Sequence, residues 1–429
     1  MIAFMLVFLL ATMLLGIPIL LCIALVGFIG IAVIPDLVLP LFPQKMFSQL
    51  ESFTLLALPY FILAGSIMSA GGLSKQLVDF ARALVGHLQA GLAQASIVAS
   101  MVFAGISGSS TADASAISSI LIPTMKQSGY KPGFAAALIA TAGTIGAIIP
   151  PSMTMVVYGA IAQVSIGGLF LGGIIPGILV GLFLMVTVKL YTYHPDYPEL
   201  RETSGRFDFY ALLRSVWTVW PALLAPLIII GGILTGVFTA TEAGVVACLY
   251  AFIVGYFVYR QIKLSDMVGI FVDAAITTSM VSGIIAVSGA MGWLLAYLQF
   301  NDMVLSSMTS LSQSPLVILF IFAGVMIVLG TFVDSLAILL VFAPVAIQLS
   351  QRYGIDPFQM GLVMVMCNQI GAVSPPTAPL LFVTTSIAKT TFQETNRHVW
   401  WFMLAEVLVL LLVILIPGLS SWIPKYFLG

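Results

Sequence analysis

Charged side chains are scarce in this sequence. Of its 429 residues only 7% are Asp, Glu, Lys or Arg, whereas 61% are hydrophobic and the mean hydropathy is +1.16. A soluble domain carries roughly 25% charged residues, so we exclude a soluble globular fold and expect lipid to cover most of the surface. The formal net charge of −1 gives no basic surface for nucleic acid.

Cysteine, histidine and enzyme motifs are equally scarce. The three cysteines, Cys22, Cys248 and Cys367, lie apart in apolar sequence and lack metal or redox spacing. The three histidines lie near predicted span ends, which argues against a histidine proton relay. Gly-x-Ser-x-Gly, His-Glu-x-x-His and Walker-type phosphate motifs are missing. We therefore expect neither an enzyme nor ATP-driven transport, and no cofactor.

Apolar stretches are what the sequence has in abundance. Stretches of about 20 residues, long enough to cross the hydrocarbon layer as a helix, recur from end to end. We predict an all-α polytopic membrane protein whose first crossing is too long, and too poor in flanking basic residues, for a signal peptide. The predicted crossings are 1–34, 50–70, 131–163, 168–190, 217–236, 240–259, 266–298, 357–389 and 398–422.

Two further apolar regions, about 92–127 and 315–350, do not fit simple crossings. Small or polar residues interrupt the first at 105–113 (Gly-Ile-Ser-Gly-Ser-Ser-Thr-Ala-Asp) and the second at 330–335 (Gly-Thr-Phe-Val-Asp-Ser). Non-helical backbone survives at membrane depth only where protein or a wet cavity satisfies its polar groups. We therefore predict two re-entrant helical hairpins.

The distribution of basic residues supports this map. With the N-terminus in the cytoplasm and each hairpin entering and leaving on one side, only Lys45, Arg352 and Lys425 of the 15 Lys and Arg residues lie outside. This satisfies the positive-inside rule. The amphipathic stretch 73–90 is predicted to form an interfacial helix on the cytoplasmic surface.

An internal repeat relates two halves of the chain. The sequence Gly-Ala-Ile-Ile-Pro-Pro-Ser at 146–152 recurs as Gly-Ala-Val-Ser-Pro-Pro-Thr at 371–377, and each copy follows an interrupted hairpin. An odd number of crossings separates the copies, so the second half is predicted to be inverted. We expect halves at 1–190 and 240–429, joined by a linker with one span at 191–239.

The Pro-Pro pairs of the repeat are predicted to break the helices. Because proline has no amide donor, carbonyls upstream of Pro150 and Pro375 lose their helical partners and become oxygen ligands suited to Na⁺. The half-helix N-termini favour a carboxylate, and interrupted helices in inverted repeats mark the binding sites of secondary transporters. The hairpin tips add the hydroxyls of Ser107, Ser109, Ser110, Thr111 and Thr331. We predict one cation site in each half.

Structural roles remain open for several of these residues. Gly and Pro are ordinary in membrane helices, where small residues let helices pack closely. Asp113 and Asp334 are intramembrane acids, which usually have a function because their burial is costly, yet each could instead cap a half-helix. Thr239 and Glu242 match a capping box, which favours a helix start over contact with substrate.

Several motifs together resemble one known family. Leu-Pro-Tyr-Phe-Ile-Leu-Ala-Gly at 58–65, Gly-Gly-Leu at 71–73, Gly-Ile-Pro at 16–18, the 105–113 sequence and the stretch 239–243 resemble the large membrane subunit of tripartite ATP-independent periplasmic (TRAP) transporters, the DctM-like family. The resemblance spans nearly the whole chain. It implies an elevator-type, Na⁺-coupled importer of organic acids in the bacterial inner membrane. It also implies two partners, a small four-helix membrane subunit and a soluble periplasmic substrate-binding protein.

The resemblance also implies site residues. The first sodium site would be formed by Gly105, Ser107, Gly146 and Ile149, and the second by Gly330, Thr331, Gly371 and Ser374, mostly through backbone carbonyls. The substrate-binding candidates are Ser109, Ser110, Thr111, Asp113, Asp334 and Thr377. Substrates of the family include C4-dicarboxylates, sialic acids and other carboxylated sugars. A sialic acid is our first expectation and a C4-dicarboxylate the second.

Two other functions remain open at this point. The chain could be a stand-alone anion transporter, coupled to Na⁺ or H⁺, that needs no binding protein. Proton coupling would require Asp113 or Asp334. The chain could also be a membrane scaffold that transports nothing.

Overall fold

The structure, a computed structural model, is helical throughout the residues that it describes, which are 1–35, 37–201, 207–333 and 335–428. Seven helices of this part of the chain are long and apolar enough to cross a membrane. They are Phe53–Ala70 (η1 and α4), α10 (Ile166–Tyr191), α11 (Phe209–Leu234), Ala240–Val258 (α12 and η4), α13 (Leu264–Tyr297), α16 (Ser335–Tyr353) and α19 (Phe392–Leu415). The prediction of an all-α polytopic membrane protein is confirmed.

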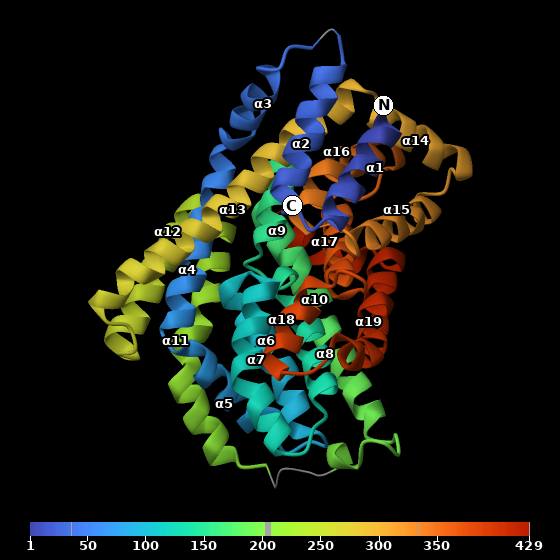
Figure 1. The fold of residues 1–429 in the computed structure, drawn as a ribbon. Helices are drawn as coiled ribbons and strands as arrows, with labels where there is room; N and C mark the ends of the chain where they lie inside the picture. The colour runs from blue at the N-terminus through green and yellow to red at the C-terminus, as the bar shows by residue number, and fades with distance from the viewer. Residues whose placement is uncertain (36, 202–206, 334, 429) are drawn as a thin grey trace.

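Four helices, which we call the scaffold, gather on one side of the molecule. α4 (Ala57–Ala70), α11 and α12 (Ala240–Ile253) stand together at the left of Figure 1, and the long helix α13 runs diagonally past them. α4 packs on both α12 and α13. Large apolar side chains of the scaffold point outwards, such as Trp217 on α11 (79% exposed) and Val268 on α13 (70% exposed). Such a surface is stable in lipid and not in water.

Both regions predicted as hairpins are pairs of helices joined by a short break. The first pair, hairpin 1, consists of α6 (Gly91–Ser107) and α7 (Ser110–Gln127), which pack on each other. Gly108 at its tip has a φ of +65°, a conformation that favours glycine, and Ser109 caps α7 by accepting a hydrogen bond from the amide of Ala112 at 3.4 Å. The second pair, hairpin 2, consists of α15 (Pro315–Gly330) and α16.

Both Pro-Pro segments interrupt a helix as predicted. Interrupted helix 1 consists of α8 (Pro132–Gly143), the 3₁₀ turn η2 (Thr144–Ala147) and α9 (Met153–Ala162). Interrupted helix 2 consists of α17 (Pro357–Val373) and α18 (Pro379–Ala388). After the first break the Ser152 hydroxyl starts α9 again by accepting from the amide of Met155 at 3.3 Å. Neither segment is a continuous rod.

The hairpins and interrupted helices form the interior with α10 and α19. α8 is buried on every side, because it packs on α6, α7, α18 and α19. α7 packs on α8 and α18, and α16 packs on α17 and α9, so each hairpin contacts both interrupted helices. We call this group of helices the interior domain.

Three predicted crossings differ from the observed helices. The 217–236 crossing begins earlier than predicted, because α11 starts at Phe209, after its N-cap Asp208. The 1–34 stretch is two shorter helices, α1 (Ile2–Leu14) and α2 (Ile19–Val33), which lie side by side at the top of Figure 1. The reason is local: Gly16 has a φ of +77°, and Pro18 has no amide to continue a helix. The 398–422 crossing is also misplaced, because α19 begins at Phe392 and ends at Leu415, just before Pro417.

The remaining helices are short. α5 (Leu73–Val85) confirms the amphipathic helix predicted at 73–90, since it buries Leu73, Leu77, Val78, Ala81 and Val85 on one face. Three helices were not predicted at all, namely α3 (Leu41–Leu50), α14 (Phe300–Leu311) and α20 (Gly418–Leu428). The turn η3 (Pro198–Arg201) lies in the linker between the halves.

A capping box begins α12, as the sequence predicts. The amide of Glu242 donates to the Thr239 hydroxyl at 3.3 Å, and the amide of Thr239 donates to the Glu242 carboxylate at 2.8 Å.

Thr239→Ala should therefore destabilise the first turn of α12 by about 1 kcal/mol, whereas Thr239→Ser keeps the acceptor. Hydrogen exchange of the amides at 241–243 should become faster in the Ala variant only. Equal exchange rates of these amides in the Ala and Ser variants would show that the Thr239 hydroxyl does not stabilise the first turn of α12.

Candidate functional site

The tip of hairpin 1 lies against the break of interrupted helix 1. The amide of Met153 donates to the carbonyl of Gly108 at 3.3 Å. A Cβ atom added to Gly108 would overlap the Pro151 carbonyl, and one added to Gly105 would lie 3.7 Å from the Pro150 carbonyl. The two backbones thus meet at atomic contact, which only glycine permits at the tip.

Asp113 folds back into this contact. The Ser107 hydroxyl donates to Oδ1 of Asp113, and the amide of Ser109 donates to the Ser107 hydroxyl at 3.1 Å. Asp113 is fully buried, and its Oδ2 has no hydrogen-bond partner among the described residues. Because Ser109 is the N-cap of α7, the capping alternative for Asp113 is wrong.

Gly146 lies directly beneath the Asp113 carboxylate. A Cβ atom on Gly146 would collide with Oδ2 of Asp113 and would lie 3.2 Å from the carbonyl carbon of Ser109. The structure therefore brings together Ser107 and Gly146 of the first predicted sodium site. Gly105 lies beside the neighbouring Pro150 carbonyl, whereas the side chain of Ile149 packs towards Gly177 of α10.

The second site begins with another contact between glycines. A Cβ atom added to Gly330 would lie 3.1 Å from Cα of Gly371, and one added to Gly371 would lie 2.6 Å from Cα of Gly330. The Thr377 hydroxyl donates to the carbonyl of Thr331, which joins the tip of hairpin 2 to the break of interrupted helix 2. Three of the four residues predicted for the second sodium site thus lie together.

Ser374 is the fourth residue, and its hydroxyl points elsewhere. It donates to the carbonyl of Ile370 at 2.7 Å and lies 3.0 Å from the sulfur of Met403 on α19. Only its backbone remains in position to contribute to a site. Asp334, the acid predicted opposite Asp113, lies outside the described residues.

The hydroxyls proposed to bind substrate lie at the tip of hairpin 1 and at the break of interrupted helix 2. Ser109 and Thr111 have their hydroxyl oxygens 3.2 Å apart, with Thr111 exposed, and Thr377 is exposed in the break of interrupted helix 2. The Ser110 hydroxyl donates to Oε1 of Gln369 at 2.6 Å. This bond joins hairpin 1 directly to interrupted helix 2.

Two polar residues of this region, Glu406 and Asn368, were not predicted from the sequence. Glu406 on α19 is 2% exposed, its Oε1 accepts from the Thr144 hydroxyl in η2, and its Oε2 has no partner among the described residues. Asn368 donates to the carbonyl of Ser335 at 3.1 Å, while its own Oδ1 is buried without a partner in the described chain. The available signal was polarity inside predicted crossings, a feature that usually marks function.

The chemistry of these groups suits a hard cation. Buried side-chain oxygens that lack a hydrogen-bond donor among the described residues are found near each glycine contact, at Asp113 and at Asn368. Backbone carbonyls and one carboxylate are ligands of Na⁺ rather than of zinc or copper. Across the described residues, no group of three His, Cys, Asp or Glu side chains converges as a transition-metal site would require.

Comparison with known proteins places the chain in a family. Residues 6–419 match the model of the DctM component of tripartite ATP-independent periplasmic transporters. The chain is 37% identical to the C4-dicarboxylate TRAP transporter large permease protein DctM of Pseudomonas aeruginosa, covering 89% of this chain and 88% of that protein. It is 35% identical to the sialic acid TRAP transporter large permease protein SiaM of Vibrio cholerae, covering 90% of each.

A solved structure shares the fold. MtrF of Neisseria gonorrhoeae, from a class of antimetabolite efflux pumps, superposes with a TM-score of 0.56 over 87% of this chain and 83% of its own, at 13% sequence identity. This similarity shows a shared fold only, whereas the family match and the two relatives show common ancestry. The chain therefore belongs to the DctM family of TRAP transporter large permeases, multi-pass proteins of the bacterial inner membrane.

Proposed function

We propose that this chain is the large permease subunit of a Na⁺-coupled importer of an organic acid. The observation that carries the proposal is that two hairpin tips abut two interrupted helices, with a buried oxygen near each contact that has no partner within the described part of the chain. A carboxylate oxygen buried without a donor is costly unless a cation or a proton joins it. Sodium at each contact removes that cost, and its release restores it.

An inverted repeat accounts for the packing of the interior domain. α7 and α16 each contact the second segment of the opposite interrupted helix, α18 and α9 respectively. Each also contacts the first segment of its own interrupted helix, α8 and α17. A two-fold relation between oppositely oriented halves produces such reciprocal contacts.

Movement of the interior domain against the scaffold would expose the site alternately to the two sides of the membrane. Two glycines lie at the boundary that such movement would cross. A Cβ atom added to Gly65 of α4 would lie 3.3 Å from the Ser107 carbonyl, and one added to Gly105 would lie 3.3 Å from Pro226 of α11. Glycine at these points lets the helix backbones approach closely.

The substrate in this proposal is a carboxylate. The two relatives are described as permeases for a C4-dicarboxylate and for sialic acid, both of which carry carboxylate groups. The N-terminal turns of α7 and α18 offer amides and hydroxyls near Ser109, Thr111 and Thr377, which suit a negative ligand. Of the two candidate substrates, we expect sialic acid first and a C4-dicarboxylate second.

A small four-helix membrane subunit and a periplasmic substrate-binding protein complete the proposed transporter. Membership in a family of tripartite transporters favours this arrangement over a stand-alone anion transporter. The non-transporting scaffold is not favoured either, because both relatives are described as permeases of transporters.

Proteoliposomes that contain all three components test the coupling. Uptake of labelled sialic acid or succinate should occur only with an inward Na⁺ gradient and only with the binding protein present, because the ions and the delivered substrate complete the site together. Uptake that follows a pH gradient and ignores Na⁺ would reject the coupling. Uptake by this chain alone would reject the partners.

The glycine contacts give a sharper test. Gly146→Ala places a methyl group against the Asp113 carboxylate, and Gly371→Ala places one against the Gly330 backbone. Overpacking of about 1–3 kcal/mol should reduce Na⁺-driven uptake by roughly tenfold or more. The matched control is Gly231→Ala on α11, where a Cβ atom meets nothing within 4 Å. Normal uptake by both site variants, at normal expression, would show that these contacts have no part in transport.

Asp113→Asn separates Na⁺ from H⁺ as the coupling ion. Asparagine keeps an acceptor for the Ser107 hydroxyl but removes the negative charge that faces Gly146. The Na⁺ concentration for half-maximal uptake should rise roughly tenfold, the effect of about 1.4 kcal/mol. Asp273→Asn, an exposed position on α13, serves as control. An unchanged Na⁺ requirement, combined with loss of a response to pH, would instead assign proton transfer to Asp113.

A further inference from the structure

A groove of about 520 Å³ lies apart from the proposed transport site, between the C-terminal half of α10 and the N-terminal half of α19. Its walls are apolar and open to the outside of the protein: Val186 and Leu190 on α10 are 58% and 62% exposed, and Leu404 and Leu408 on α19 are 45% and 41% exposed. Such walls favour contact with the hydrocarbon layer of the bilayer or binding of a single hydrocarbon chain.

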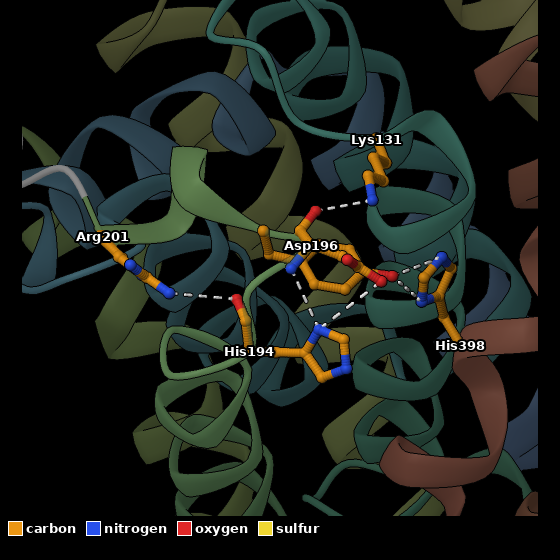
Figure 2. Close-up of polar contacts among 6 residues, drawn as sticks. Lys131, His194, Asp196, Arg201 and His398 are labelled. Atoms are coloured by element: carbon orange, nitrogen blue, oxygen red, sulfur yellow. Dashed lines mark hydrogen bonds and ion pairs between the residues drawn. The ribbon is translucent and has the colours of Figure 1, made fainter.

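One end of the groove is closed by the turn that follows α10. The Tyr197 hydroxyl lies 3.3 Å from Nδ1 of His398 on α19, and Lys131 at the start of α8 donates to the Asp196 carbonyl at 2.7 Å (Figure 2). The Lys131 ammonium also lies 4.0 Å from the centre of the Tyr197 ring, a cation–π contact. Burial raises the pKa of Tyr197 above its ordinary value, so its hydroxyl stays protonated. Contacts from α8 and α19 hold the turn in place.

The closed end is polar and carries a cation that lacks a partner. Arg397 lines the groove there, is exposed, and makes no hydrogen bond or ion pair with any residue that the structure describes. The acid at this end, Asp196, has its Oδ2 3.9 Å from Nδ1 of His194. Trp401, one helical turn from Arg397, lines the same end, as aromatic side chains do at the membrane–water interface.

These features select one class of ligand. A partner helix that lay between α10 and α19 would run into the turn at 194–197, whereas a lipid ends there in its headgroup. The free guanidinium of Arg397 matches a phosphate, to which arginine binds through charge-assisted hydrogen bonds. The positive-inside assignment puts this end at the cytoplasmic leaflet, where anionic lipids and basic pockets between helices meet.

We propose that this groove binds an anionic phospholipid, with its phosphate at Arg397 and one acyl chain between α10 and α19. Bound there, the lipid links the two halves of the chain, because α10 belongs to the first and α19 to the second. The proposal concerns binding to the folded chain and holds whether or not transport is coupled to Na⁺.

The test compares lipids on the purified, delipidated full-length chain, alone and with the small membrane subunit. The probes are phosphatidylglycerol and phosphatidylcholine with the same acyl chains, and inorganic phosphate. Native mass spectrometry counts the lipid retained, and thermal unfolding measures its stabilising effect. Arg397→Gln removes the cation, Val186→Trp fills the groove from an exposed position, and Arg214→Gln on α11 is the matched control.

Phosphatidylglycerol should be retained and should raise the unfolding temperature more than phosphatidylcholine, while inorganic phosphate has no effect. Arg397→Gln should weaken phosphatidylglycerol binding by roughly tenfold, the loss of one charge-assisted hydrogen bond, and Val186→Trp should reduce retention of both lipids. The control variant should match the wild type.

Equal binding of the two lipids, or wild-type affinity in Arg397→Gln, would overturn the proposal. So would stabilisation by inorganic phosphate alone. Cross-linking of a cysteine placed at Val186 to the small membrane subunit, with neither lipid retained, would make the groove a protein interface instead.

Discussion

Polar backbone at helix ends inside an apolar protein must find partners within the chain, and the rest of this structure follows from that constraint. The hairpin tips and the helix breaks supply one another's partners. The amide of Met153 finds the carbonyl of Gly108, and the hydroxyl of Thr377 finds the carbonyl of Thr331. Glycines allow the approach, since a side chain at Gly108, Gly330 or Gly371 would push the backbones apart.

Two buried acids surround the turn η2 within this framework. Asp113 lies against Gly146 and Glu406 against Thr144, and each carboxylate has one oxygen bonded to a hydroxyl and one that lacks a partner among the described residues. In a low-dielectric interior, the charge state of these two carboxylates affects the position of η2, and the position of η2 in turn affects their charge state. Binding of a cation near Gly146 would therefore affect α19, the helix that also forms one wall of the groove proposed to bind a lipid.

The interior domain and the scaffold have different surfaces for different tasks. Helices such as α8 and α17 are buried on nearly every side, so they hold the site in a fixed geometry. The scaffold helices expose large apolar side chains, and glycines such as Gly65 of α4 lie where they meet the interior domain. In the proposed elevator transport, the interior domain moves as a rigid body against the scaffold.

The sequence by itself determined where the chain is apolar and where helices break, because glycine, proline and small hydroxyl residues act locally on the backbone. The hairpins and both Pro-Pro interruptions were predicted for this reason, and the unnoticed break at Gly16 and Pro18 obeys the same rule. Only the tertiary structure decided that Ser110 meets Gln369, that Glu406 reaches Thr144 and that the Ser374 hydroxyl turns towards Met403. These contacts join residues that are far apart in the sequence. Because the helices are apolar on nearly all faces, hydrophobic periodicity does not show which face is buried. Tertiary packing therefore decides which polar side chains meet.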